Sequence, residues 1–155
     1  MWSYVEKVLQ PGEIVAFKGT IHWFIYLPAF VFAALALAVL AGQAVWDGPD
    51  GQGFASIAAL VLGVIALAYF LRAWFKRFTT EIAVTDRRVI FKEGFISRQT
   101  VEMNMTKVES VDVSQSILGR MFDYGDIVVR GTGHGLEPVK SVARPLAFRN
   151  AVIAR

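Results

Sequence analysis

The sequence of 155 residues contains no cysteine and only two histidines, His22 and His134. A chain without cysteine has no disulfide framework and no thiolate metal site, and two histidines so far apart in sequence do not form a metal-binding cluster. The remaining polar residues show neither a nucleophile elbow nor a pair of catalytic carboxylates. We therefore expect no catalytic residues, no metal and no cofactor, and hence no enzyme.

Charged residues are also missing from two long runs, residues 19–46 and residues 51–71. Within the first run, WFIYLPAFVFAALALAVLA (residues 23–41) would rise about 28 Å as a helix, close to the ~30 Å hydrocarbon core of a bilayer. The second run contains FASIAALVLGVIALAYFL, residues 54–71. Trp23, Tyr26, Trp46 and Tyr69 stand near the ends, as interfacial aromatic anchors do. The runs predict two transmembrane helices, at about residues 23–45 and 54–75.

Two other interpretations of these runs fit the sequence less well. A cleaved signal peptide has a shorter apolar region, of about 7–15 residues, and is not followed by a second span. Two buried helices of a soluble protein would need more surrounding protein than 155 residues supply. We therefore retain an antiparallel helical hairpin through a membrane.

The flanking charges predict how this hairpin is oriented. The loop between the two runs holds two acidic residues and no basic one, whereas basic residues stand outside both runs: Lys7, Lys18, Arg72, Lys76 and Arg77. The positive-inside rule then places both termini in the cytoplasm and the short loop outside. We expect a multi-pass protein of a prokaryotic inner membrane.

Small residues recur every four positions along each run. Such patterns let helix backbones approach closely in lipid, so they are candidates for packing within the hairpin or between copies: Ala34, Ala38 and Gly42 in the first run, Ala55, Ala59 and Gly63 in the second. Neither run contains a charged side chain, so no ion pathway or proton relay is visible. A channel or pump is not expected.

From residue 78 the apolar residues alternate with a period of two, which is typical of half-buried strands. Phe78, Thr80, Ile82 and Val84 share one face, and further short alternating segments predict about six strands up to residue 142. Pro145 then suits the first position of a C-terminal helix. The predicted fold is a membrane α + β protein: an N-terminal segment (1–22), a helical hairpin (23–75) and a small curved β-sheet with a closing helix (76–155).

Residues 114–125, SQSILGRMFDYG, interrupt these strands and are called the knuckle below. A helical turn capped by Ser114 would gather four apolar side chains on one side: Ile117, Leu118, Met121 and Phe122. We favour an interpretation in which these four fill one end of the curved sheet, while the glycines of the knuckle allow tight turns. The alternative is a contact surface for lipid headgroups or a neighbouring subunit, made by Leu118, Arg120 and Phe122.

Two further features raise the question of anion binding. Five basic residues are candidate contacts for anionic lipid: Arg72, Lys76, Arg77, Arg87 and Arg88. Each basic residue near an anionic membrane contributes about 1 kcal/mol, although the positive-inside rule accounts for the first three by itself. The glycine-rich residues 131–135, GTGHG, precede a strand-like segment instead of a helix, so they fit a hairpin turn better than a phosphate-binding loop.

Short motifs follow one another through the second half of the chain: Thr85-Asp86-Arg87-Arg88 at a strand turn, Gly94 with Ser97-Arg98, residues 108–113, residues 115–120, and Tyr124-Gly125. In this order they resemble the bacterial pleckstrin-homology (PH) domain family, of the YdbS-like type that is attached to a transmembrane hairpin. The resemblance implies a partly open β-barrel of pleckstrin type capped by a C-terminal helix. It implies no catalytic residues.

Three functional hypotheses are compatible with these features. The first is a non-enzymatic scaffold or assembly module at the cytoplasmic face, whose partners are membrane lipid and either copies of itself or another membrane protein. Open strand edges of a small sheet favour self-association. The second is a sensor of anionic lipid acting through Arg87 and Arg88, and the third is an accessory subunit of a membrane transporter or protease. Nucleic acid is not an expected partner, because the charges are dispersed and no binding motif accompanies them.

Overall fold

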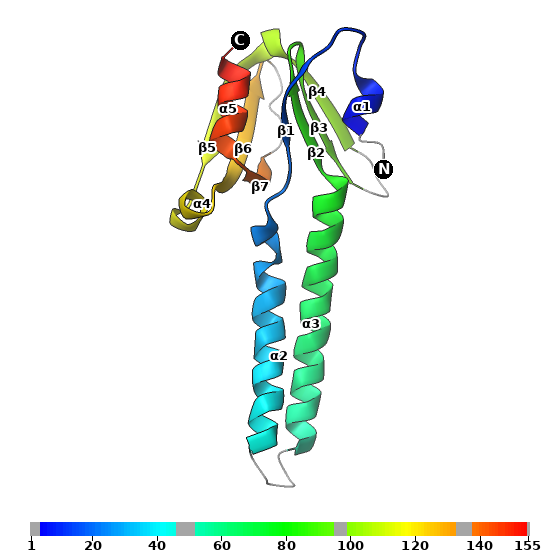
Figure 1. Cartoon of the computed structure of the whole chain (residues 1–155), viewed down its shortest axis with the longest axis vertical. Helices are drawn as coiled ribbons and strands as arrows, with labels where there is room; N and C mark the ends of the chain where they lie inside the picture. The colour runs from blue at the N-terminus through cyan, green and yellow to red at the C-terminus, as the bar shows by residue number, and fades with distance from the viewer. Residues whose placement is uncertain (1–3, 46–51, 95–98, 133–137, 155) are drawn as a thin grey trace. The chain divides into compact units, whose positions relative to one another are not determined.

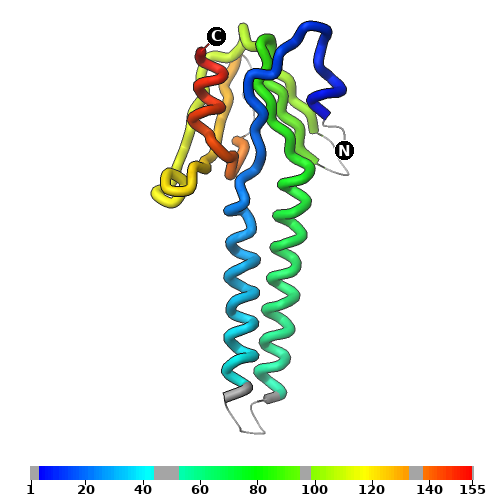
Figure 2. The backbone as a smooth tube through the Cα atoms, viewed as in Figure 1, coloured from blue at the N-terminus to red at the C-terminus, as the bar shows by residue number. Residues whose placement is uncertain are grey.

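The computed structural model describes residues 4–45, 52–94, 99–132 and 138–154. The chain forms two compact units (Figures 1 and 2). One unit, called the β unit below, combines residues 1–22 with residues 76–155, and the other, the helical unit, is Trp23–Phe75. The β unit is therefore assembled from two parts of the chain that flank the helical unit in sequence.

The helical unit contains the 3₁₀ helix η1 (Trp23–Tyr26), helix α2 (Leu27–Val45) and most of helix α3 (Gln52–Thr79). Helices α2 and α3 are long and apolar enough to cross a membrane, and only 11% of an apolar 18-residue stretch in each is buried. Core helices of soluble proteins are mostly buried, whereas Leu37 on α2 and Leu60 on α3 are each 67% exposed. The chain thus carries two candidate membrane-spanning helices.

The two helices contact each other through small and aromatic side chains. Buried alanines recur seven residues apart, a spacing that keeps one stripe of a helix on one side: Ala29 and Ala36 on α2, and Ala59, Ala66 and Ala73 on α3. The rings of Phe32 and Tyr69 stack with their centroids 5.5 Å apart. Near the hairpin tip, Gln43 Nε2 donates a 2.9 Å hydrogen bond to Ser56 Oγ. Such interhelical hydrogen bonds add to helix association in lipid.

Among the described residues of the β unit, seven strands form two antiparallel sheets, with the orders β1-β2-β3-β4 and β5-β6-β7. The strands are β1 (Val15–Gly19), β2 (Glu81–Thr85), β3 (Arg88–Glu93), β4 (Gln99–Asn104), β5 (Val108–Ser114), β6 (Tyr124–Gly131) and β7 (Val139–Ala143). The helices are α1 (Tyr4–Val8), the 3₁₀ helix η2 (Met105–Lys107), α4 (Ile117–Met121) and α5 (Pro145–Ile153). The six predicted strands of the second half are confirmed as β2 to β7, and the C-terminal helix as α5.

The segment that precedes the first span connects the two sheets. Strand β1 pairs antiparallel with β2, and the chain then runs on beside β7. There the Ala143 N–H donates to the Thr20 carbonyl at 2.9 Å, and the His22 N–H donates to the Ser141 carbonyl at 2.7 Å. The two unclosed sheets, with the C-terminal helix, confirm the predicted pleckstrin-like architecture, and the described open side lies between the edge strands β4 and β5.

The interior of the β unit is filled by side chains. Ile21, Ile90 and Phe148 are among its largest fully buried side chains, and Phe148 of α5 meets the Phe17 ring edge-on with centroids 6.0 Å apart. The cavity that remains in this core has a volume of about 10 Å³, which is room for about one water molecule. The described interior therefore offers no chamber for a ligand.

Two local predictions differ from the structure. Helix α3 continues through Phe78 to Thr79 and β2 begins at Glu81, so Phe78 is not a strand residue. The helix persists because Lys76 and Arg77 favour its C-terminal end, and the Thr80 N–H still donates to the Lys76 carbonyl at 3.1 Å. Residues 1–22, for which the sequence suggested no element, supply α1 and β1.

Some predicted features lie outside the described residues. They are Trp46 and the acidic loop with Asp47 and Asp50, the pair Ser97-Arg98, and His134 in the glycine-rich turn. The described strands that precede and follow residues 133–137 are β6 and β7, which pair antiparallel.

Candidate functional site

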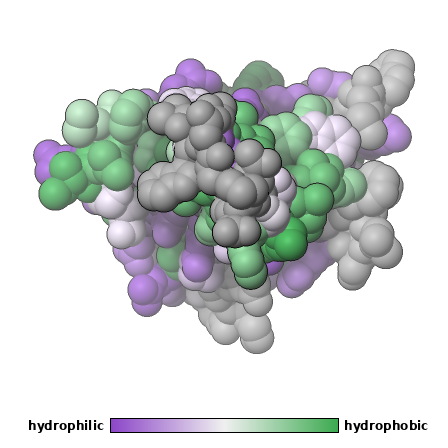
Figure 3. Space-filling view, turned by 90° about the horizontal axis from the view of Figure 1, so that it is seen from below, coloured by the Kyte–Doolittle hydropathy of each residue, from purple (hydrophilic) through white to green (hydrophobic). Residues whose placement is uncertain are grey.

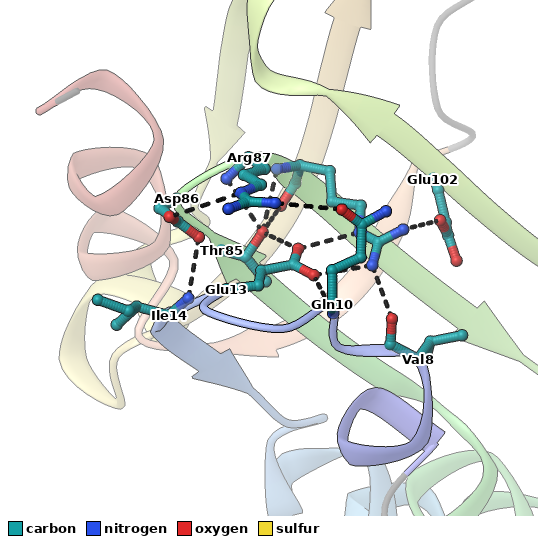
Figure 4. Close-up of polar contacts among 9 residues, drawn as sticks. Val8, Gln10, Glu13, Ile14, Thr85, Asp86, Arg87 and Glu102 are labelled. Atoms are coloured by element: carbon teal, nitrogen blue, oxygen red, sulfur yellow. Dashed lines mark hydrogen bonds and ion pairs between the residues drawn. The ribbon is translucent and has the colours of Figure 1, made fainter.

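Residues of the β2–β3 turn hold the segment that leads into β1 (Figure 4). The Arg88 guanidinium donates to the Glu13 carboxylate from Nη2 at 2.8 Å and from Nε at 3.0 Å. The Thr85 hydroxyl donates to the same carboxylate at 2.7 Å. The side chain of Glu13 is fully buried. We call Thr85-Asp86-Arg87-Arg88 together with Glu13 the TDRR clasp.

Arg88 also binds two other parts of the β unit. Its Nη1 donates to the Glu102 carboxylate on β4 at 2.7 Å, and Nη2 donates to the Val8 carbonyl at the end of α1, also at 2.7 Å. The hydrogen bonds from Arg88 lower the pKa of Glu13 to about 2 against the opposing effect of burial, and the same bonds raise the pKa of Arg88. The guanidinium of Arg88 thus binds two carboxylates and one carbonyl, and it connects three parts of the β unit: α1, the turn that precedes β1, and strand β4.

The other two residues of the motif bind the same segment. The Asp86 carboxylate accepts a 2.9 Å hydrogen bond from the Ile14 N–H, and the Asp86 N–H donates to the Ile14 carbonyl at 3.0 Å. Arg87 Nη1 donates to Gln10 Oε1 at 3.2 Å. All four residues of the motif therefore hold residues 8–14, which explains why they occur together at this turn.

Sequence reasoning missed Glu13, the partner of Arg88. A local signal was present, since the Pro11-Gly12 turn precedes VAFKG, in which Val15 and Phe17 alternate with exposed neighbours. That alternation predicts a strand, and a carboxylate just ahead of a strand is a candidate partner for a basic turn. Nothing local indicates which turn, because Glu13 and Arg88 are 75 positions apart.

The five basic candidates for lipid contact fall into two separate groups. Arg72, Lys76 and Arg77 occupy the C-terminal part of α3, where Lys76 Nζ lies 3.9 Å from the Glu93 carboxylate. Arg87 and Arg88 follow the far end of β2, whose five residues span about 16 Å. The structure therefore does not bring the five together into one headgroup site.

The structure of the knuckle differs from the favoured prediction in its cap residue and in the direction of its apolar side chains. The N-cap of α4 is Ser116, whose hydroxyl accepts a hydrogen bond from the Gly119 N–H at 3.1 Å, and not Ser114, which is the last residue of β5. The four apolar side chains do not fill an end of the sheet, because Ile117 is 81% and Met121 72% exposed, and Leu118 and Phe122 are exposed as well. The prediction that they belong to the core was wrong, and α4 presents them outward.

Close backbone contacts fix this outward orientation. Gln115 Nε2 donates to the carbonyls of Gly119 and Tyr124, at 3.3 and 3.1 Å. A Cβ at Gly119 would lie 2.6 Å from the Tyr124 carbonyl oxygen, and one at Gly125 would lie 2.7 Å from that of Ser114. The tight turns predicted at these two glycines were wrong, because Gly119 lies within α4 and Gly125 within β6. Both positions instead allow a close backbone approach, which leaves α4 no room to turn its apolar face inward.

The knuckle continues into a ring stack at the end of the β unit where the first span begins. The rings of Tyr124 and His22 lie with their centroids 5.2 Å apart and nearly parallel. Burial, and next the charge of Arg77, lower the pKa of His22. Because His22 is bonded to Trp23, the stack lies at the point where the chain enters the helical unit.

A groove runs along the edge strand β5. It is bounded by η2, β5 and the last turn of α5, with a volume of about 430 Å³, and Ser110, Arg149 and Ile153 are among the residues that line it. Figure 1 shows α5 beside β5 on this side of the β unit. Among the described strands, β5 is paired only with β6, so the groove lies next to backbone groups of an open sheet edge. Open sheet edges of this kind are the surfaces to which an added strand binds in other proteins.

The small-residue stripes occupy different faces of the helices. Ala59 is buried, and Ala55 and Gly63 are partly buried, whereas the three residues on α2 are exposed: Ala34, Ala38 and Gly42. A Cβ at Gly42 would touch nothing within 4 Å. The stripe on α2 therefore lies on the outside of the hairpin.

The described residues bring together no metal-binding cluster. Among them, no group of three or more histidine, aspartate and glutamate side chains could hold a metal ion. What the fold defines is a pleckstrin-like domain whose chain is interrupted, between β1 and β2, by an apolar helical hairpin.

Comparison with protein families agrees with this class. The family model described as bacterial PH domain matches residues 23–154, which is most of the chain. The chain belongs to the bacterial PH domain family. The match identifies the family and not the YdbS-like type within it, and it begins after β1. No curated protein matches the chain, and no solved structure does.

Proposed function

We propose that this protein is a non-enzymatic assembly module, anchored by its helical hairpin at the cytoplasmic face of a prokaryotic inner membrane. The pairing of β1 with β2 supports this topology, because it requires the residues before the first span and those after the second to be on the same side. The basic residues at both outer flanks favour the cytoplasmic side.

The observation that carries the assembly role is the open edge of β5 beside the groove. We infer that the occupant is β5 of a second copy, added antiparallel across a twofold axis. Such a pair satisfies both open edges at once. The groove is lined by one acidic and one basic residue, Glu109 and Arg149, so the same surface offers complementary charges to its symmetry mate.

The lipid-sensing alternative finds less support in this arrangement. Arg88 is bound to the carboxylates of Glu13 and Glu102. A headgroup contact would therefore rest on Arg87, whose guanidinium already donates to Gln10, and on the group Arg72, Lys76 and Arg77. These three also satisfy the positive-inside rule without a specific lipid.

Disulfide cross-linking tests the assembly role directly, because the chain has no cysteine of its own. Ser110→Cys places a thiol on the edge strand β5, and Arg130→Cys is the matched control, since Arg130 is exposed and directly opposite Ser110 on the central strand β6. In native membranes we expect an oxidant to give a product of twice 17.2 kDa with Ser110→Cys and not with Arg130→Cys. Equal cross-linking of both variants, or none of either, would contradict self-association through β5, and a product with a different protein would favour the accessory-subunit alternative.

A further inference from the structure

The knuckle gathers an unusual share of the apolar surface of the β unit. Four of the eight large apolar side chains that are exposed on its described residues lie within residues 117–122. In Figure 3 the surface of α4, at the left, shows hydrophobic residues grouped together with a hydrophilic one beside them. Arg120, in the last turn of α4, is the basic residue of this helix.

The outward orientation of these side chains is a property of the backbone and not of loose packing. The polar groups of the knuckle are satisfied locally by the Ser116 cap and by the two hydrogen bonds of Gln115. The close approach at Gly119 holds α4 against the Tyr124 carbonyl. The apolar face therefore stays in place whether or not anything covers it.

The position of the knuckle points to what covers it. Tyr124 stacks on His22, the residue bonded to the first residue of the first candidate span. Only two residues lie between Met121 and Tyr124, so three Cα–Cα steps limit the distance between their Cα atoms to about 11 Å. At any orientation of the two units, the knuckle therefore remains close to the point where the chain would enter the bilayer.

We propose that α4 inserts its apolar side chains into the interfacial layer of the membrane in which the hairpin is anchored. Short apolar surfaces with a basic residue bind this layer, with the charge directed to the headgroups. A stable protein partner needs about 800 Å² on each side, more than one turn of helix presents. The hairpin also keeps the membrane at a high effective concentration beside the knuckle. The surface bound is thus a lipid interface, and no specific headgroup is required.

This inference rests on the proposed membrane anchorage and is independent of self-association through β5. Its test uses the full chain in lipid nanodiscs, with single cysteines carrying an environment-sensitive fluorophore. Met121→Cys probes the knuckle. Ile14→Cys is the control, because Ile14 is also an exposed apolar residue of the β unit, 66% exposed, but lies at the TDRR clasp. Leu60→Cys reports on the span itself.

We expect a blue-shifted emission at Met121→Cys, quenching by lipids spin-labelled near the headgroup, and protection from aqueous iodide. Ile14→Cys should show the opposite pattern. Iodide quenching at Met121→Cys equal to that at Ile14→Cys, with Leu60→Cys quenched by lipid, would overturn this inference and leave the anchorage intact. Loss of lipid quenching at Leu60→Cys would instead refute the anchorage. Protection of Met121→Cys from both quenchers would also overturn the inference, because it would mean that protein and not lipid covers the knuckle.

Discussion

Replacing Arg88 tests whether its hydrogen bonds to Glu13, Glu102 and Val8 stabilise the β unit. Arg88→Met keeps a long side chain but removes two hydrogen bonds to Glu13, one to Glu102 and one to the Val8 carbonyl. The Glu13 carboxylate then stays in a fully buried place without a positive charge. We expect the β unit to lose stability, mainly through this carboxylate.

The size of this loss of stability depends on whether Glu13 takes up a proton when Arg88 is absent. Leaving one partner of a buried pair uncompensated costs about 3–5 kcal/mol. Glu13 limits this cost by taking up a proton, and protonating a group whose ordinary pKa is 4.5 costs about 3 kcal/mol at neutral pH and less than about 1 kcal/mol at pH near 5. The wild-type pKa of about 2 lies below the ordinary value, so the contribution of Glu13 to wild-type stability is complete above 4.5 and is lost only as the pH falls toward 2. The difference between variant and wild type should therefore shrink as the pH falls from neutral to about 5.

The assay is urea unfolding of the β unit in the full chain, held in lipid nanodiscs and followed by the sheet signal in circular dichroism. The control is Arg88→Met combined with Glu13→Gln, which removes the buried charge and should recover most of the loss at neutral pH. If Arg88→Met costs the same at both pH values, or if Glu13→Gln gives no recovery, the carboxylate of Glu13 is not the group left uncompensated.

Three further predictions use the same preparation. Gly125→Ala puts a Cβ 2.7 Å from the Ser114 carbonyl oxygen and should destabilise the β unit by about 1–3 kcal/mol in urea unfolding; an unchanged midpoint would show that the backbone relaxes there. Because the pKa of His22 is lowered in the fold, His22 binds a proton more readily in the unfolded chain, and the stability of the β unit should decrease as the pH falls below about 6.5. His22→Phe should flatten this pH dependence of stability while keeping the ring stack on Tyr124. Ala66→Leu, on the buried face of α3, should lengthen the interhelical distances measured by pulsed electron paramagnetic resonance, whereas Leu67→Ala, on its exposed face, should not.

The helices and most strands were predictable because their signals are local. An uncharged run of the right length predicts a span whatever surrounds it, and the two runs became α2 and α3. Alternation within a few residues likewise predicted β2 to β7. Strand β1 was not predicted, because the alternation of Val15 and Phe17 extends over only five residues and its partner β2 lies more than sixty positions later. Pairing across such a distance has no local signature.

The residues of the candidate site were likewise predicted only as far as their local signals allowed. The helical period correctly placed Ile117, Leu118 and Met121 on one face of a turn, but a period does not say which way that face points. The direction was decided by a cap at Ser116 and a close approach at Gly119. For Arg88, a basic residue at a strand turn is equally suited to an anionic lipid and to a buried carboxylate of its own chain. Only the folded chain reveals that Glu13 is there.

The order of elements along the chain also has a consequence for biogenesis. Strand β1 leaves the ribosome before either span, and its partner β2 only after both. The pairing of β1 with β2 therefore cannot form during synthesis until both candidate spans have been made. In a chain that inserted one span and missed the other, β1 and β2 would be on opposite sides of the membrane, and the TDRR clasp could not form. If the hairpin spans a membrane as proposed, a folded β unit therefore requires that both spans have been inserted, because a chain with incorrect topology would leave β1 and β2 unpaired.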